Sequence, residues 1–239
     1  MPNWVYNTLT IQGPKSEIDF IKDKLNTSYT RQHDQWNTET NVYETKDITF
    51  SNPIFAFWNI IKPTDLEAYV KQPDHSLPLS ESLKFETNDW YAWNVRNWGT
   101  KWDVAVNDDE KYPETELVQH MSNDEDQWLV YRFNTAWSPP FPVMINLSKL
   151  VANCVITLSY EEETGWGGEA EFLRGVMTSD SQYGWQCREC DHKEEESPWC
   201  EECEYDMCPS CGYGEPDEIC QTHMIESELP PKVTVKENA

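Results

Sequence analysis

The sequence predicts an α+β protein: an antiparallel or mixed sheet with helices on one face, followed by a small zinc-binding module. Three observations support this. Several short segments rich in β-branched and aromatic residues alternate apolar and polar positions, as strands with one buried face do. Between residues 103 and 177 the predicted order is strand, strand, helix, strand, strand, which is not a βαβ repeat. Seven of the eight cysteines lie between residues 187 and 220.

The cysteine distribution separates two parts of the chain. We expect an α+β body over residues 1–178, with a division into 1–100 and 101–178 left open. A zinc-binding module is expected over residues 185–226. Residues 227–239 are polar and contain prolines, so we expect a flexible tail there.

The N-terminal segment predicts a strand followed by a helix. Residues 4–13 read WVYNTLTIQG, with alternating apolar positions, and Gly13-Pro14 ends the strand. Residues 15–25 place isoleucines and a leucine at helical spacing, with Ser16 as the expected N-cap.

The middle of the chain is less regular. Residues 26–46 are polar and predict a loop. Residues 48–63 are apolar, but Pro53 excludes a central strand there. Residues 64–72 have an acidic first turn after a threonine and predict a short helix.

The elements of the C-terminal part of the body follow in order. We expect strands at 102–106 and 128–136, then a helix over 139–153 with an extended, proline-rich entry. Two further strands, at 154–163 and 167–177, are joined by a hairpin-type turn with the sequence TGWGG.

Charge and hydropathy limit the possible partners. The chain has 43 acidic residues against 18 Lys and Arg, a formal charge of −25. Such a surface repels phosphate, which argues against direct nucleic-acid binding and favours basic partners, although the charge could also serve solubility alone. The sequence has neither a secretory leader at its start nor an apolar run of membrane-spanning length. We therefore expect a cytoplasmic protein, in a bacterial host, with reduced cysteines.

The cysteine-rich module contains four pairs of candidate metal ligands. Two residues separate the members of each pair, as in zinc knuckles. The pairs are Cys187 and Cys190, Cys200 and Cys203, Cys208 and Cys211, and Cys220 and His223. Eight ligands suffice for two closed structural Zn²⁺ sites. A disulfide framework would need an oxidising compartment, and an iron–sulfur cluster gives no reason for the Cys-His pair. Spacing leaves open whether neighbouring or alternate pairs share an ion.

The stretch CEECEYDMCPSC, residues 200–211, resembles the ZZ-type zinc finger. That resemblance implies a cross-braced module. One ion would take Cys187, Cys190, Cys208 and Cys211, and the other Cys200, Cys203, Cys220 and His223. The family usually ends in two histidines, and Cys220 replaces one of them here.

The same resemblance implies a peptide-binding role for Glu204, Tyr205 and Asp206, in an acidic pocket for an N-terminal amine. Arg188 stands where some peptide-binding members have an acid, which argues against a pocket for N-terminal arginine. Residues 186–228 hold 14 acids and two basic residues, which independently favours a cationic ligand. Alternatively, Asp206 only accepts backbone hydrogen bonds within the knuckle.

Residues 88–103 contain four tryptophans among charged side chains. One interpretation is a corner of the core, where each indole N–H finds a partner. The other is a ligand pocket formed by Trp98, Lys101, Trp102 and Asp103.

The body is similar to the YubB-like proteins of phages and plasmids. The segments that carry the resemblance are MPNWVYNTLTIQGP, NWGTKWD, FNTAWSPPFPV and YEEETGWGGEAEF, in that order over residues 1–177. The resemblance implies a ferredoxin-like C-terminal half and a mobile-element origin, and it implies no reaction.

The sequence is compatible with three functions. No nucleophile elbow, P-loop, Rossmann or HExxH motif is present in the sequence. We therefore expect a non-enzymatic adaptor whose zinc module binds a cationic or N-terminal peptide of a host protein. The alternatives are an acidic nucleic-acid mimic that inhibits a host DNA- or RNA-binding protein, and an enzyme built on the tryptophan-lined pocket.

Overall fold

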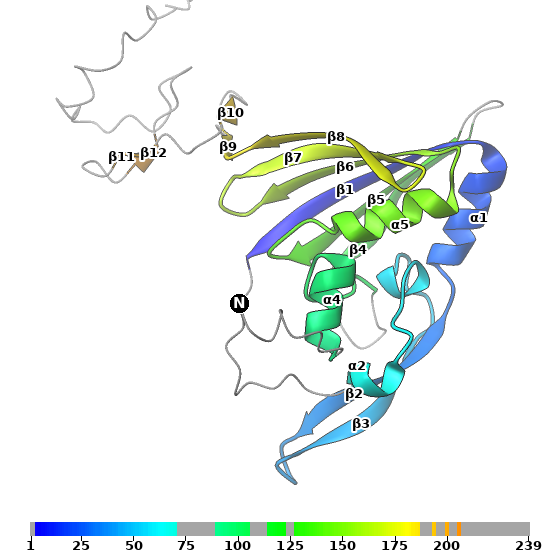
Figure 1. The fold of residues 1–239 in the computed structure, drawn as a ribbon, viewed down its shortest axis with the longest axis vertical. Coiled ribbons are helices and arrows are strands. Elements are labelled where there is room, and N and C mark those ends of the chain that lie inside the picture. The colour runs from blue at the N-terminus through cyan, green and yellow to red at the C-terminus, as the bar shows by residue number, and fades with distance from the viewer. Residues whose placement is uncertain are drawn as a thin grey trace, which may run out of the picture. The chain divides into compact units, whose positions relative to one another are not determined.

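The computed structural model describes residues 3–70, 89–105, 114–122 and 127–186, with three two-residue strands beyond them (Figure 1). The chain divides into two compact units. The first comprises residues 1–163 and 167–181, and the second comprises residues 164–166 and 182–239. Within the described residues, no helix is both long and apolar enough to span a membrane.

A six-stranded sheet organises the first unit, with the order β4-β5-β1-β6-β7-β8. Its strands are β1 (Trp4–Gly13), β4 (Thr115–Ser122), β5 (Gln127–Ala136), β6 (Val155–Glu162), β7 (Gly167–Leu173) and β8 (Val176–Tyr183). β1 pairs antiparallel with β5 on one side and with β6 on the other. With helices α1 (Lys15–Leu25) and α5 (Phe141–Leu150), the elements β1-α1-β4-β5-α5-β6 form a ferredoxin-like arrangement.

This topology joins the two ends of the body in one sheet. β1 supplies a central strand, and its partners β5 and β6 come from beyond residue 126. A domain boundary at residue 100 would separate β1 from both partners. The α+β class with antiparallel pairing is confirmed, whereas the ferredoxin-like arrangement needs the N-terminal strand as well as the C-terminal half.

The core lies between this sheet and the two helices. Along β1, Val5, Leu9 and Ile11 are fully buried, because alternate side chains point to the same face. α1 contacts β1 and β5, and α5 contacts β6 and β7. Pro14, without a side-chain bond, occupies the N-cap of α1, so the expected cap at Ser16 is wrong.

The segment between α1 and β4 forms a second group of elements. It contains β2 (Tyr29–Asn37), β3 (Val42–Phe50), a 3-10 helix η1 (Phe57–Asn59), α2 (Leu66–Val70) and α4 (Trp90–Trp98). β2 and β3 pair as a separate antiparallel hairpin, seen at the bottom of Figure 1. The loop predicted over 26–46 is therefore wrong. The pattern fails because most β3 side chains are exposed, so no apolar alternation marks the strand.

Two further predictions need correction. Residues 102–105 of the strand expected at 102–106 are irregular backbone, residue 106 lies outside the described residues, and β4 lies farther on. The expected strand at 167–177 is two strands, β7 and β8, joined at Arg174 and Gly175. Both residues have positive φ angles, 52° and 81°, as a tight hairpin turn requires.

Candidate functional site

The tryptophan-rich helix α4 contributes mainly to the core. Asp89 caps it by accepting hydrogen bonds from the N–H groups of Tyr91 and Ala92, and Gly99 ends it with a left-handed φ of 79°. Trp98 is fully buried, and its Nε1 donates to the carbonyl of Ile61 at 3.0 Å. Trp98 is therefore a core residue with its one donor satisfied.

Asp103 is a buried anchor for the loop that precedes α2. Its Oδ1 accepts the N–H of Phe57 at 2.8 Å, and its Oδ2 accepts the N–H of Trp58 at 3.2 Å. Oδ1 also accepts the N–H of Val104 at 2.8 Å, and the Tyr29 hydroxyl donates to Oδ2 at 3.1 Å. The carboxylate is thus used in holding backbone segments together.

Lys101 and Trp102 lie in a different environment, within an aromatic cluster near the surface. The Lys101 Nζ lies 4.5 Å from the ring centroid of Trp102, 5.2 Å from that of Trp137 and 5.7 Å from that of Tyr91. Partial burial lowers the pKa of Lys101. Trp137 is 44% exposed and has a φ of 71°, a strained value for a bulky residue.

The structure therefore separates the four residues expected to form one ligand pocket. Trp98 and Asp103 are buried and satisfied, while Lys101 and Trp102 belong to the aromatic cluster. Two of the four residues are therefore used in the core, while Trp102 is 37% exposed.

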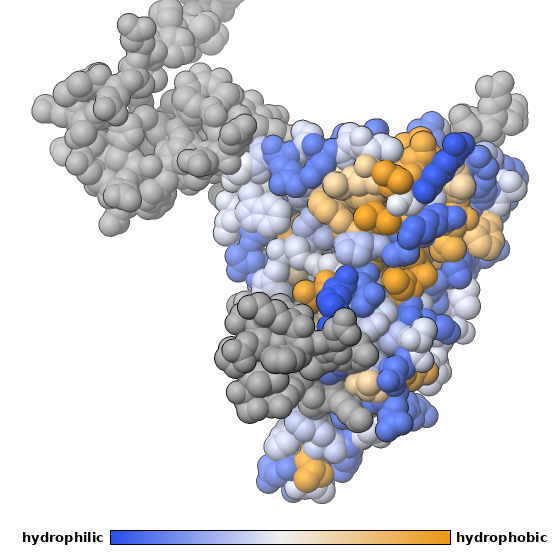
Figure 2. Space-filling model, viewed as in Figure 1, coloured by the Kyte–Doolittle hydropathy of each residue, from blue (hydrophilic) through white to orange (hydrophobic). Residues whose placement is uncertain are grey.

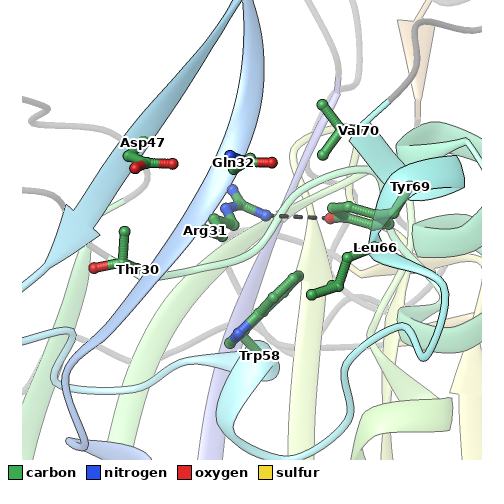
Figure 3. A pocket seen from close by; sticks show the side chains of 8 residues that line it. All are labelled: Thr30, Arg31, Gln32, Asp47, Trp58, Leu66, Tyr69 and Val70. Carbon is green, nitrogen blue, oxygen red and sulfur yellow. Dashed lines mark hydrogen bonds between the residues drawn. The ribbon is translucent and has the colours of Figure 1, made fainter.

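A different cavity, of about 150 Å³, lies between the β2–β3 hairpin, η1 and α2 (Figure 3). Its lining combines a guanidinium, two aromatic rings, two aliphatic side chains and three smaller polar groups. These residues are Thr30, Arg31, Gln32, Asp47, Trp58, Leu66, Tyr69 and Val70.

Arg31 is the cation of this cavity. Figure 3 shows its guanidinium pointing from β2 toward Tyr69 of α2, and Nη1 donates to the Tyr69 hydroxyl at 3.2 Å. The guanidinium carbon lies 5.5 Å from the ring centroid of Phe50 and 5.6 Å from that of Trp58. Its Nε is buried and has no hydrogen-bond acceptor among the described residues.

The tyrosines around Arg31 are held by further hydrogen bonds. The buried Tyr69 hydroxyl donates to Asn94 Oδ1 at 2.9 Å, and the Asn94 amide in turn donates to the carbonyl of Lys101 at 2.8 Å. Burial raises the pKa of Tyr69 to about 12, although the Arg31 charge opposes the shift. Burial and the nearby Asp103 carboxylate raise the pKa of Tyr29 further.

Electrostatics keep Arg31 protonated. Burial acts to lower the pKa of Arg31, but Tyr69, Tyr29 and Asp103 together raise it. His33, two residues along β2, has a lowered pKa because of burial and the Arg31 charge. The cavity therefore presents a permanent positive charge in a chain of strongly negative formal charge.

Sequence reasoning did not find this cavity. Arg31 falls in the segment predicted as a loop, and Trp58 and Tyr69 belong to two other elements. The one local signal is the pairing of Trp36 with Tyr43 across the hairpin, whose rings lie 5.1 Å apart. Aromatic residues on either side of a polar turn are typical of a hairpin.

The exposed surface of the face in Figure 2 mixes apolar and hydrophilic patches, with apolar ones in the region of α5. Leu150 at the end of α5 and Val176 at the start of β8 are exposed apolar residues. Exposed apolar residues are normal on folded proteins, so these define no site alone.

Most of the predicted metal ligands lie outside the described residues. These are Cys187, Cys190, Cys203, Cys208, Cys211, Cys220 and His223, and Glu204 lies outside as well. Cys200 falls in β11 (Trp199–Cys200), and Tyr205 and Asp206 form β12. Across the parts of the chain with a described structure, no cluster of three His, Cys, Asp or Glu side chains suited to a metal was found.

Comparison with known proteins gives one family match. Residues 101–200 match the family model described as the ferredoxin-like domain in Api92-like protein. No curated protein matches the chain. The crystal structure of a protein Api92 from Yersinia pseudotuberculosis aligns with a TM-score of 0.39 at 11% identity, covering 78% of this chain and 100% of that one.

The matched range holds β4 to β8 and α5, whereas β1, from outside that range, supplies a central strand of the same sheet, and α1 contacts β1 and β5. Residues 101–200 are thus similar to the ferredoxin-like domain in Api92-like protein.

Proposed function

We propose that the chain is a non-enzymatic protein-binding protein of mobile-element type. Its C-terminal module, of ZZ-like kind, holds two structural Zn²⁺ ions and binds a cationic or N-terminal peptide of a host protein, while the YubB-like body is its scaffold. The observation that carries the proposal is a pair of short antiparallel ladders around the first two cysteine pairs.

The first ladder joins β9 (Trp185–Gln186) to β10 (Lys193–Glu194), with Gln186 opposite Lys193. The second joins β11 to β12, with Cys200 opposite Tyr205. In the sequence, Cys187 and Cys190 lie between the two strands of the first ladder, and Cys200 lies in the second ladder with Cys203 three residues after it. Short antiparallel strands next to CxxC pairs support the proposal, because such pairs can occupy two adjacent corners of a tetrahedral zinc site.

The charge around the second ladder supports a cationic ligand. Asp206 lies on β12 beside Tyr205, and Glu204 directly precedes it. Thiolates around Zn²⁺ add further negative charge to a segment already rich in acids. A free amine or a basic side chain would be attracted to this segment.

The metal part is tested by metal analysis with thiol counting. We expect about two zinc per chain, because eight candidate ligands are present. Cys154 is buried and its pKa is raised to about 12, so this thiol reacts only after the body unfolds. Chelation should therefore expose the seven cysteines of the module before Cys154. One zinc per chain would contradict the assignment of four pairs.

The binding part is tested by calorimetry with basic peptides that carry free or acetylated N-termini. Replacing both Glu204 and Asp206 by Ala should weaken binding at least tenfold. The matched control, Glu195 and Glu196 both replaced by Ala, removes the same charge elsewhere in the module. Equal losses of affinity in both variants would show that the peptide responds only to the overall charge of the module. If no peptide binds, the peptide-binding pocket is excluded.

A further inference from the structure

We propose that the cavity beside Arg31 binds a small monocarboxylate. The ligand carboxylate would accept hydrogen bonds from the guanidinium, and its apolar part would contact Trp58, Leu66 and Val70. This site is independent of the zinc module, since every lining residue belongs to the body.

The first support is unused donor capacity. An arginine side chain carries several N–H donors in a planar fork. Among the described residues, Arg31 makes a single hydrogen bond, from Nη1 to Tyr69, and its buried Nε makes none. A buried donor without a partner is destabilising, so an acceptor in the cavity would be favourable.

The second support is the missing counter-ion. No ion pair within the described part of the chain involves Arg31. Asp103 is a nearby buried carboxylate, and it contributes to raising the pKa of Arg31. However, this carboxylate already accepts hydrogen bonds from backbone N–H groups and from the Tyr29 hydroxyl. The Tyr69 hydroxyl already donates to Asn94, so toward Arg31 it acts as an acceptor. A ligand anion would provide the charge partner that the fold does not.

Shape and charge define the ligand class. A cavity of about 150 Å³ holds only a few non-hydrogen atoms. The aromatic and aliphatic walls suit a short apolar group, and the planar fork matches a carboxylate. Asp47 in the lining and the formal charge of −25 oppose multiply charged anions such as phosphates. The carboxylate could belong to a free small acid or to the C-terminus of a peptide.

The test is calorimetric titration of the full chain with 3-methylbutanoate, its amide, and short peptides ending in valine with free or amidated C-termini. We expect saturable binding of at least one carboxylate, at least tenfold tighter than the matching amide. Binding of the acid identifies a free-acid site, and binding of the free peptide alone identifies a C-terminus site. Equal behaviour of acid and amide forms, or no binding, overturns the proposal.

Three variants separate binding from stability. Leu66 is 54% exposed, so Leu66→Trp should fill the cavity mouth and abolish binding without lowering the melting temperature. Arg31→Lys keeps the charge but loses the fork, and should weaken binding at least tenfold. Arg132→Lys makes the same change at an exposed position outside the cavity lining and should have no effect. Unchanged binding in Leu66→Trp would place the ligand elsewhere and overturn the proposal.

Discussion

The sheet with its two helices and the segment inserted between α1 and β4 are stabilised in different ways. The sheet core is formed by alternating apolar side chains, such as Leu9, Leu129 and Leu158, which are all fully buried. Within its described residues, the inserted segment buries aromatic side chains such as Phe57 and Trp98, and buried polar groups, above all Asp103 and Asn94, link its elements by hydrogen bonds. The sheet core is therefore stabilised by apolar packing, whereas the described part of the inserted segment combines apolar packing with buried hydrogen bonds.

This difference has a functional consequence. Closely packed apolar layers leave little room for a ligand, because each buried side chain is surrounded by others. The inserted segment uses partly satisfied polar groups and leaves a cavity beside Arg31. The cavity beside Arg31 therefore offers a ligand polar contacts that the apolar interior of the sheet does not.

The largest expected effect is in the sheet. Leu9→Ala, on the central strand opposite Leu158, should lower the free energy of unfolding by about 4 kcal/mol through lost burial and a residual cavity. Chemical denaturation measures this value. Thr8→Ala, on the other face of β1, should cost less than about 1 kcal/mol. Similar losses in both variants would contradict the one-faced core.

Asp103→Ala tests whether one polar group supports the inserted segment. The change leaves several buried N–H groups without their acceptor, and should cost about 3 kcal/mol. Asp103→Asn keeps one acceptor oxygen and should cost about half as much. A loss below about 1 kcal/mol in Asp103→Ala, measured by denaturation, would show that the hydrogen bonds of the anchor are dispensable.

Alkaline pH should lower the free energy of unfolding through Tyr69, which lies in the inserted segment. The Tyr69 pKa is raised from 10.0 to about 12 by burial, so below pH 10 the phenol is protonated in both folded and unfolded states. As the pH rises from 10 to 12, the unfolded state loses its proton first and stability falls, by about 2 kcal/mol from this residue. Tyr69→Phe should remove that part of the fall. An unchanged pH profile, followed by denaturation at each pH, would contradict the shift.

The smallest effect concerns the cap of α4. Asp89→Ala removes the acceptor for two N–H groups and should cost about 1 kcal/mol. Asp89→Ser keeps a capping oxygen and should recover most of the loss. If Asp89→Ala lowers the free energy of unfolding as much as Asp103→Ala does, Asp103 is not more important than an ordinary helix cap in this segment.

The sequence predicted those elements whose buried side chains recur with the period of a strand or of a helix. β1, α1, β5, α5 and β6 all have this pattern, and their predicted positions agree with the structure to within a few residues. The hairpin of β2 and β3 was missed because few of its β3 side chains are buried, so backbone pairing forms it without an apolar signature.

The Arg31 cavity could not be predicted for a different reason. Its three main residues, Arg31, Trp58 and Tyr69, come from a strand, a 3-10 helix and an α-helix whose approach depends on tertiary packing. Conversely, Trp98 and Lys101 lie close in sequence but face different environments. Sequence proximity grouped residues that the fold separates.

The central position of β1 also affects how the chain is made. Its first residues pair with Ala136 and Glu162, so β1 is synthesised well before both of its partner strands. Until residue 162 has left the ribosome, the apolar face of β1 lacks one of its two partner strands. Such non-local pairing slows folding and exposes aggregation-prone edges on the nascent chain. Truncation before β6 should therefore yield an insoluble product, even though the inserted segment and α1 are complete.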